Sequence, residues 1–428
     1  MSTKTFFERQ IMHMRKGGRA AFFSKIKRLP SYLLAIPFVI VIRLIRPVLL
    51  VRFGKMRSER IGHFALNTEW YLCERDAGIN VPSSWYVDIF FYGPPVSNMQ
   101  LAKMWKRVLR VWPAWLMTPL YDVNRMIPGG TAHDVGINAP HNGPDVHGLQ
   151  GRFLPHLTFS PEEKIRGEAG LRLLGIPPHT PFVCLAVRDS AYLDAYLPEA
   201  DWSYHNHRDS DIQNYMLAAE ELAHRGYFVI RMGAKVREAI KSSHPRIIDY
   251  ATNGTRSDFM DMYLGAKCTF CFSSSTGFDT IPIIFRRPVA YVNMVPLGYL
   301  QTYCAQSIGI TKHHFAAREN RELTLEDIFV CGAGFYDRAS QYKDNGIQLI
   351  ENTPEEIRDV AVEMMKRLRG TWQPRADDDV LQARFWRIFP IDARTPDGKH
   401  PLHGKVHLRY GASFLRNNRW WLEISRKS

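Results

Sequence analysis

The chain has 428 residues, which is long for a single hydrophobic core, so we expect two domains. Its content of 45% hydrophobic and 23% charged residues is typical of a globular protein and excludes a low-complexity chain. The net charge of +14 is concentrated at one end, because residues 1–60 contain 14 Lys/Arg and 2 Asp/Glu and the rest of the chain is nearly neutral.

Residues 1–47 form a basic and apolar N-terminal arm. Its uncharged stretch, 29–42, is shorter than the ~20 residues that cross a bilayer, and no clear signal-peptide cleavage site follows it. Basic residues that flank a short apolar stretch favour a segment lying in an anionic membrane interface. The alternative is a basic helix followed by a buried helix or strand. We expect no nucleic-acid partner, because no basic motif with interleaved aromatic residues occurs outside the arm.

The next segment, 48–160, has the pattern of a first Rossmann-like domain. Apolar runs predict strands over 48–53 and 85–92, and apolar spacing predicts helices that begin near Ile61 and Met99. Residues 127–152 are rich in Gly, Pro, Asn and His, which is typical of an irregular segment near a domain junction.

A second domain is predicted over 161–375. Ser160, Pro161 and Glu163 form a capping box that begins its first helix. Strands and helices then alternate, which predicts a parallel sheet flanked by helices. The strands are expected at 181–187, 227–231, 247–250, 268–272 and 289–293, and the helices at 211–225, 259–265, 280–285 and 354–369. The segment 376–428, with a helix near 380–388, is expected to cross back to the first domain.

The six cysteines do not form a recognisable disulfide framework. They are scattered and most have apolar neighbours, which favours reduced thiols in a cytosolic compartment. Cys268 and Cys271 have C-x-x-C spacing, but no second pair follows, so we expect neither zinc nor redox chemistry there.

The strand at 268–272 ends in four hydroxyl residues and a glycine. Backbone amides and hydroxyls between a strand and a helix favour a phosphate group. We therefore predict that Ser273, Ser274, Ser275, Thr276 and Gly277 hold a diphosphate, although an ordinary helix N-cap needs one such hydroxyl. Asp279 either accepts ribose hydroxyls or favours the helix N-terminus.

Two other strands end in groups that suit the same ligand. Arg188 follows the strand at 181–187 and matches phosphate oxygens bidentately, unless it forms a surface ion pair. Arg231, Gly233 and Lys235 end the strand at 227–231, and Gly233 suggests close backbone approach to a nucleobase.

The segment HNHRDSD, residues 205–211, offers several polar groups. His207 and Arg208 are candidates for contact with an anionic substrate. Asp209-x-Asp211 resembles a metal-binding motif, but an N-cap at Ser210 or Asp211 is favoured. Asp258 is expected to cap its helix, with a base or ribose contact as the alternative.

The loop and helix near residue 60 supply candidates for a general base. Arg60, His63, Asn67 and Glu69 are predicted to line the opposite wall of a cleft between the domains. Either His63 or Glu69 would deprotonate an acceptor hydroxyl.

Several motifs of the predicted second domain resemble those of a bacterial family of glycosyltransferases from surface-polysaccharide gene clusters. The motifs are VRDS, HRDSDI, VIRMG, SDFMDMYLGAK, SSTGFDTIP and RPVAYVN. Arg188, Ser273 and Ser274 also match, more distantly, the diphosphate-binding positions of α1,6-fucosyltransferases, although Asp189 replaces a second arginine. The resemblance implies a GT-B fold of two facing Rossmann-like domains and no catalytic metal.

The expected function is transfer of a sugar from a nucleotide-diphospho-sugar co-substrate, without cofactor, to a glycan or lipid-linked acceptor in polysaccharide synthesis. The expected location is cytoplasmic, peripheral on the inner face of the bacterial cytoplasmic membrane. One alternative is a nucleotide-sugar epimerase or hydrolase that uses His205, His207 and Asp209. The other is a non-catalytic membrane-associated scaffold.

Overall fold

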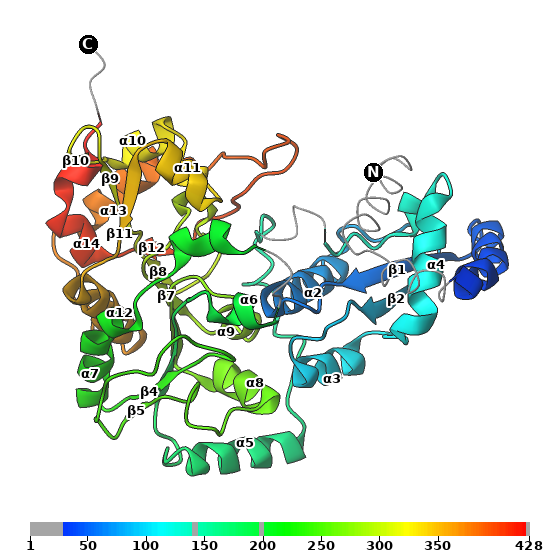
Figure 1. Cartoon of the computed structure of the whole chain (residues 1–428), viewed down its shortest axis with the longest axis horizontal. Coiled ribbons are helices and arrows are strands. Elements are labelled where there is room, and N and C mark those ends of the chain that lie inside the picture. The colour runs from blue at the N-terminus through cyan, green and yellow to red at the C-terminus, as the bar shows by residue number, and fades with distance from the viewer. Residues whose placement is uncertain (1–28, 139–143, 197–200, 425–428) are drawn as a thin grey trace. The chain divides into compact units, whose positions relative to one another are not determined.

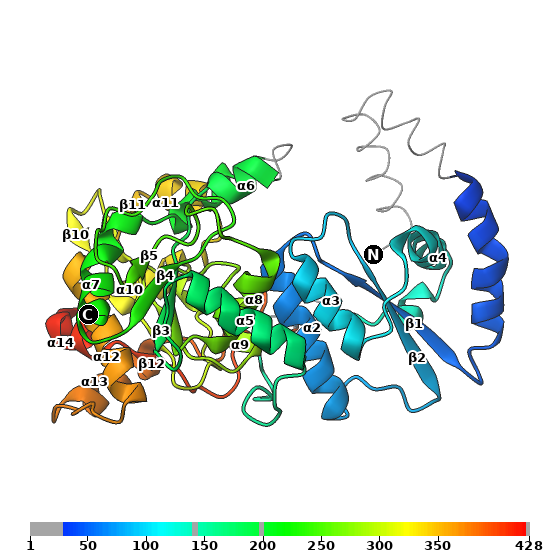
Figure 2. The ribbon, with the colours of Figure 1, turned by 90° about the horizontal axis from the view of Figure 1, so that it is seen from below.

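A computed structural model describes residues 29–138, 144–196 and 201–424 (Figures 1 and 2). The chain divides into two compact units. The first contains Met1–Glu59, Gly78–Ser97 and Ala102–Ala139, and the second contains Arg60–Ala77, Asn98–Leu101 and Pro140–Ser428. These units differ from the predicted limits 48–160 and 161–375, because helix α2 and the chain after residue 376 pack within the second unit.

The first unit is built on two parallel strands, β1 (Leu50–Met56) and β2 (Tyr86–Tyr92), which lie side by side in Figure 2. Their positions confirm the two strands predicted here, with β1 shifted toward the loop. Helix α4 (Ala114–Met126) packs on β1 through Met117 and Tyr121, and helix α3 (Met99–Val108) begins at the predicted methionine.

A helix over residues 29–44 packs against α4 in the same unit. Its side chains Ala35 and Val39 are buried against Val123 of α4. Most of its other apolar side chains are exposed. Among the residues that the structure describes, no helix combines the length and the hydropathy needed to cross a membrane. The part of the arm before residue 29 lies outside the described residues.

The second unit contains a seven-stranded sheet in which all paired strands are parallel, in the order β12-β8-β7-β6-β3-β4-β5. The strands are β3 (Phe182–Ala186), β4 (Phe228–Arg231), β5 (Ile247–Ile248), β6 (Phe270–Ser273), β7 (Val289–Tyr291), β8 (Ile308–Gly309) and β12 (Arg409–Tyr410). The alternation of strands and helices therefore predicted the parallel sheet correctly. A small antiparallel sheet, β10-β9-β11, adds β9 (His313–Ala316), β10 (Arg321–Glu322) and β11 (Ile347–Ile350).

Helices surround this sheet, and α7 and α12 pack against each other. The helices are α2 (Ile61–Asp76), α5 (Pro161–Leu173), α6 (Ala191–Tyr196), α7 (Met216–His224), α8 (Asp258–Lys267), α9 (Thr280–Ile284), α10 (Leu325–Val330), α11 (Ala339–Asp344), α12 (Pro354–Leu368), α13 (Asp378–Ile388) and α14 (Ala412–Asn417). The predicted capping box of α5 is confirmed, because Ser160 accepts from the Glu163 amide and Glu163 accepts from the Ser160 amide.

The sheet core explains the cysteines. Cys184 and Cys271 lie on β3 and β6, Cys268 lies two residues before β6, and all three are free and buried. Burial raises the pKa of Cys184 and of Cys271 well above its ordinary value, so these thiols stay protonated. They fill the core as small apolar groups.

Candidate functional site

The predicted diphosphate residues meet at one edge of the large sheet. Strands β3 and β6 are parallel neighbours, with Ala186 opposite Ser273, so the chain leaves both strands at the same edge. The backbone amide of Arg188 donates to Ser274 Oγ over 2.8 Å, and the Ser274 amide donates to the Ala186 carbonyl. The chain segments after β3 and β6 therefore adjoin, whereas a phosphate contact from the Arg188 guanidinium stays a prediction.

The hydroxyls after β6 mainly hold the turn itself. Ser273 Oγ donates to Asp279 Oδ2 over 2.9 Å, and Thr276 Oγ1 accepts from the Phe278 amide. The side chains of Ser273 and Ser274 are buried, so the loop shape explains part of the hydroxyl pattern without a ligand. Their predicted contact with a diphosphate stays a prediction.

Ser275 links this loop to Arg208. Its backbone has a φ of 62°, in the left-handed region that residues other than glycine seldom adopt. Arg208 Nη2 donates to the Ser275 carbonyl over 2.7 Å, which fixes the guanidinium beside the loop. Loop and arginine are therefore positioned together.

Gly277 has a packing role that its place in the motif did not reveal. A Cβ at Gly277 would lie 3.3 Å from Ile61 Cγ2 and 3.5 Å from the Gly62 amide, so the glycine lets the first turn of α2 approach the loop. Helix α2 has 16 residues and no acidic side chain in its first turn. Because α9 has only five residues, the partial positive charge beside the loop comes from the N-terminus of α2.

Two arginines and two histidines gather near this loop. Burial and the charge of Arg188 lower the pKa of Arg208 to about 10, whereas Asp279 and Asp209 oppose the shift. Burial also lowers the pKa of Arg188. The pKa of His205 and of His207 falls to about 4 through burial and the neighbouring arginines, so both rings are neutral at pH 7.

The carboxylates near these arginines balance their charge incompletely. Asp209 Oδ1 lies 3.3 Å from Arg188 Nε, and Asp209 also faces Lys312, whose ammonium donates to the Asp209 carbonyl over 2.5 Å. Burial raises the pKa of Asp279 to about 7, so this carboxyl is partly protonated near neutral pH. Arg60 adds a further cation, stacked 4.8 Å from the Trp202 ring. The cluster of Arg60, Arg188 and Arg208 can therefore bind an anion, and we call it the basic cluster.

A cavity of about 340 Å³ opens at the ends of β3 and β4. Most of its charged lining is acidic, and the carboxylates come from Asp189, Asp209, Asp211, Glu238 and Glu351. Such a lining suits hydroxyl and amino donors better than phosphate. Asp209 lies both in this cavity and beside Arg188, so the cavity and the basic cluster adjoin.

Arg231, Gly233 and Lys235, which were predicted to contact the nucleotide at the end of β4, differ from one another in burial and contacts. Arg231 is 1% exposed and donates through Nη1 to the Glu238 carbonyl over 2.9 Å, so its guanidinium holds the loop that borders the cavity. A Cβ at Gly233 would lie 2.5 Å from Val236, which gives this glycine a packing reason. Lys235 is exposed. A nucleotide contact from these three residues stays a prediction.

Two predicted helix caps have different outcomes. Asp211 Oδ1 accepts from the Gln213 amide over 2.8 Å, which confirms the N-cap interpretation of the D-x-D motif. The N-cap assignment of Asp258 was wrong, because Ser257 is the N-cap and its Oγ accepts from the Met260 amide. Asp258 is the first residue of α8, which therefore begins one residue earlier than predicted. Asp258 instead accepts from the Met99 amide over 2.8 Å.

The two candidate bases lie on α2. His63 is half-buried and follows Gly62 in the turn that contacts the loop at Gly277. Glu69 is 0% exposed, and its Oε1 lies 2.7 Å from Arg286 Nη2 and 3.1 Å from His156 Nδ1. The geometry favours a structural role for Glu69, and we retain His63 as the candidate base. Asn67, on the same helix, is buried.

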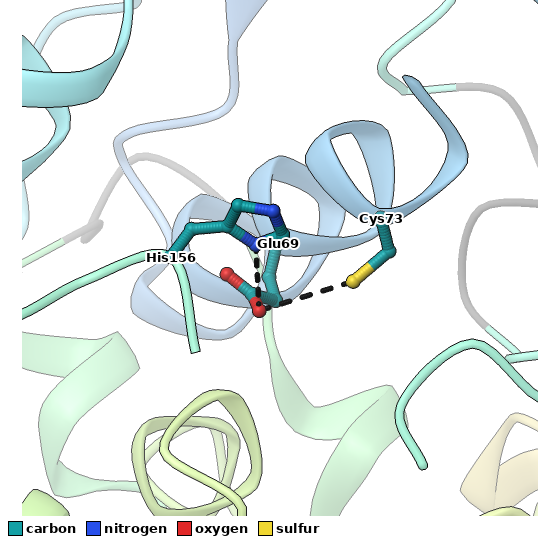
Figure 3. Close-up of side chains that lie close together, drawn as sticks. All are labelled: Glu69, Cys73 and His156. Atoms are coloured by element: carbon teal, nitrogen blue, oxygen red, sulfur yellow. Dashed lines mark hydrogen bonds and ion pairs between the residues drawn. The ribbon is translucent and has the colours of Figure 1, made fainter. Parts of the chain in front are cut away.

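Glu69, Cys73 and His156 place one ligand atom each within 4.8 Å of one another (Figure 3). Burial and the Glu69 charge raise the pKa of Cys73 to about 12, and Arg286 donates to Cys73 Sγ over 3.6 Å. The Arg286 guanidinium thus supplies the positive charge that a cation would bring. We interpret the group as a buried ion-pair network.

Sequence reasoning missed Lys312, which is buried between β8 and β9, because a lone lysine outside any motif gives no signal. It also missed Trp202, although an aromatic residue near the HNHRDSD segment suggests a platform for an arginine.

No family model and no curated protein matches the chain. Solved structures that are similar to it include two glycosyltransferases. A family 9 glycosyl transferase from Veillonella parvula DSM 2008 aligns with a TM-score of 0.38 and 8% identity over 62% of this chain and 86% of its own. The ADP-heptose lps heptosyltransferase II of E. coli aligns with a TM-score of 0.34 and 12% identity over 61% of this chain and 90% of its own. Both likenesses are remote, and the functional proposal depends on the residues of the site.

Proposed function

We propose that this chain is a glycosyltransferase of the GT-B class that uses a nucleotide-diphospho-sugar donor. The observation that carries the proposal is the basic cluster, in which the partly buried Arg188 and Arg208 lie close to each other and the nearby carboxyl of Asp279 is partly protonated. Like charges in a buried site are costly, and a bound dianion relieves that cost. A diphosphate at a parallel sheet edge, beside the N-terminus of α2, satisfies this need.

The donor lies across the basic cluster and the adjoining cavity. The diphosphate contacts Arg188, Arg208 and the amides of the 275–277 loop. The nucleoside enters the cavity of about 340 Å³, where Asp189 and Glu351 accept hydrogen bonds from ribose hydroxyls or base amino groups. Cations at one end and carboxylates at the other orient the donor in a single direction.

In the reaction, an acceptor oxygen forms a bond to the anomeric carbon of the sugar while the bond from that carbon to the diphosphate oxygen breaks. The electron pair of the broken bond leaves on the diphosphate, and the acceptor proton passes to His63. The negative charge on the leaving oxygen grows in the transition state, where Arg188 and Arg208 stabilise it. Two guanidinium charges at this point fulfil the role of a divalent cation, so we propose metal-independent transfer.

The acceptor is a glycan or a lipid-linked glycan of surface-polysaccharide synthesis, and the protein works on the cytoplasmic face of the bacterial membrane. The support is the charge of the N-terminal arm, since residues 1–47 contain 10 Lys/Arg and 1 Asp/Glu. A segment of this charge is drawn to anionic lipid headgroups.

Isothermal titration of the full chain with nucleoside diphosphates, in buffer with and without a chelator, tests the donor site. We expect one diphosphate to bind at least tenfold more tightly than its monophosphate, because the second phosphoryl group meets the basic cluster. Chelation should leave this affinity unchanged. If a well-folded protein binds no nucleotide, the proposal is wrong; if binding requires a divalent cation, only its metal-independent form is wrong.

A second candidate is a nucleotide-sugar epimerase or hydrolase, favoured by the neutral His205 and His207 beside the arginines. A neutral imidazole near the diphosphate can move a proton without an acceptor sugar. Release of free sugar or of an epimer from the donor, at a rate independent of added acceptor, would favour this candidate.

A further inference from the structure

The first unit presents a wide apolar face on the helix over residues 29–44. This outer face includes Leu33, Leu34, Phe38, Ile40, Val41 and Leu44, and Leu44 is 73% exposed. Within the described ranges, 29–138, 144–196 and 201–424, no segment buries these side chains. Contiguous apolar surface of this kind marks an interaction site.

The helix is fixed in place by its other side. Tyr32 donates to Asp122 Oδ2 over 2.8 Å, and Arg43 Nε donates to Asn124 Oδ1 over 2.8 Å. Ala35 and Val39 pack against α4 between these two bonds. At 100° per residue, the outer face lies opposite this packed stripe, so the protein holds the exposed apolar side chains in one direction.

The apolar surface continues onto α4. Leu116, Leu120 and Val123 have i, i+4, i+7 spacing, and the last two pack against the helix over residues 29–44, so the exposed Leu116 extends the same stripe. Trp112 and Trp115 are exposed at the same end of α4, Trp115 at 77%. Tryptophans at the border of an apolar face are typical of a membrane interface.

The basic residues near the helix over residues 29–44 indicate which kind of partner covers its outer face. Basic residues flank the helix on both sides in sequence, with Lys25, Lys27 and Arg28 before it and the exposed Arg46 after it. A second copy of the chain would bring the same positive charge and would be repelled. A sheet of anionic headgroups over acyl chains matches both the charge and the apolar face.

We infer that the outer face, together with Leu116, Trp112 and Trp115, is a membrane-docking surface on which the helix lies in the plane of an anionic bilayer. The helix over residues 29–44 is about 24 Å long at 1.5 Å per residue, so it presents a long edge to the acyl chain boundary. The inference extends the proposed membrane location to a folded surface, and it does not depend on the donor chemistry.

Flotation with vesicles of phosphatidylglycerol and phosphatidylethanolamine tests this surface. The full chain should float, and it should stay largely bound near 1 M salt, because apolar insertion is not screened. The double variant Val41→Glu, Leu44→Glu should bind at least tenfold more weakly, and Trp115→Ala a few-fold more weakly. A matched control is Leu173→Glu, at a leucine of the second unit that is 84% exposed, which should float normally.

The outcomes separate the inference from the proposed location. If the wild type does not float, the membrane location itself is wrong. If the wild type floats and the double variant floats equally, membrane binding resides elsewhere and the inference alone is wrong. If the wild type sediments as a dimer that the double variant dissociates, and neither floats, the face is an interface between copies. Quenching of Trp115 fluorescence by brominated lipid, measured against Trp115→Phe, gives a second readout that needs no charged variant.

Discussion

Two clusters of partly buried basic side chains in the second unit, one around Arg286 and one around Arg188, differ in the carboxylates around them. Around Arg286, the carboxylates of Glu69 and Asp76 face the guanidinium and the imidazole of His156. Burial would lower the pKa of His156, but hydrogen bonds and charge from Glu69 and Asp76 raise it above its ordinary value. Each basic group of this network, Arg286, His156 and the neighbouring Arg75, thus has a carboxylate oxygen within 3.1 Å inside the protein.

The basic cluster is not balanced in this way. Arg188 has the carboxylates of Asp209 and Asp189 nearby, and Arg208 shares Asp209 and has the partly protonated Asp279 as its other carboxyl neighbour. Burial lowers the pKa of both arginines, and the charge of Arg188 lowers that of Arg208 further. Balanced charge indicates a structural role, and unbalanced buried charge indicates a ligand.

The largest expected effect follows from removal of one arginine of the basic cluster. Arg188→Ala should lower kcat/KM by roughly 10²–10³, because the leaving diphosphate loses a preorganised cation. Stability should change by less than about 1 kcal/mol, since Asp209 keeps Lys312 and Arg237 as neighbours. Steady-state kinetics with a donor found by titration, together with urea unfolding, measure both quantities.

Arg225→Ala is the matched control, because Arg225 pairs with Glu221 on the surface of α7 and should leave kinetics and stability nearly unchanged. If Arg188→Ala retained full activity, or lost activity only through unfolding, the basic cluster would have a structural role like that of the network around Arg286.

Removal of the arginine from the network around Arg286 should lower stability and leave nucleotide binding intact. Arg286→Ala leaves the fully buried Glu69 without its cation and should lower the free energy of unfolding by about 3–5 kcal/mol. Nucleotide binding by the fraction that remains folded should persist. Urea unfolding monitored by circular dichroism, and titration below the unfolding transition, check the two parts.

Glu69→Gln combined with Arg286→Leu removes both partners and should recover part of the stability, because no unpaired charge then remains buried. A double variant less stable than Arg286→Ala would contradict the view that charge balance holds this network together.

Sequence patterns predicted those parts of the site that depend on local order. Apolar runs placed β3 and β6 correctly, and parallel strands necessarily bring Arg188 and Ser274 to one edge. The capping box at Ser160 is equally local. The N-cap of α8 was misplaced by one residue, because Ser257 and Asp258 are both good caps and sequence does not choose between them.

The rest depends on contacts between distant residues. The close approach that requires a glycine at position 277 is to Gly62, which lies far away in sequence on α2. The hydrogen bond from Ser273 to Asp279 is formed across a turn in which Ser275 has a left-handed backbone. Strands such as β8 and β12 have only two residues, too few for a pattern. The Arg286–Glu69 pair likewise has no sequence signal. The network around Arg286 was therefore not predicted, and Glu69 was assigned as a candidate general base.

The protonation of Asp279 makes stability depend on pH and leaves the basic cluster short of negative charge. Burial raises the pKa of Asp279 from 3.8 to about 7, so the folded protein holds this proton more tightly than the unfolded chain. Between about pH 4 and pH 7 the contribution of Asp279 to stability therefore falls as pH rises, by at most roughly 1.4 kcal/mol per pH unit. Asp279→Asn, whose Oδ1 still accepts from Ser273, should remove this slope, as urea unfolding across that pH range would show. Parallel curves for the two proteins would mean that Asp279 is ionised throughout and balances Arg208, which would weaken the case for an anion at this site.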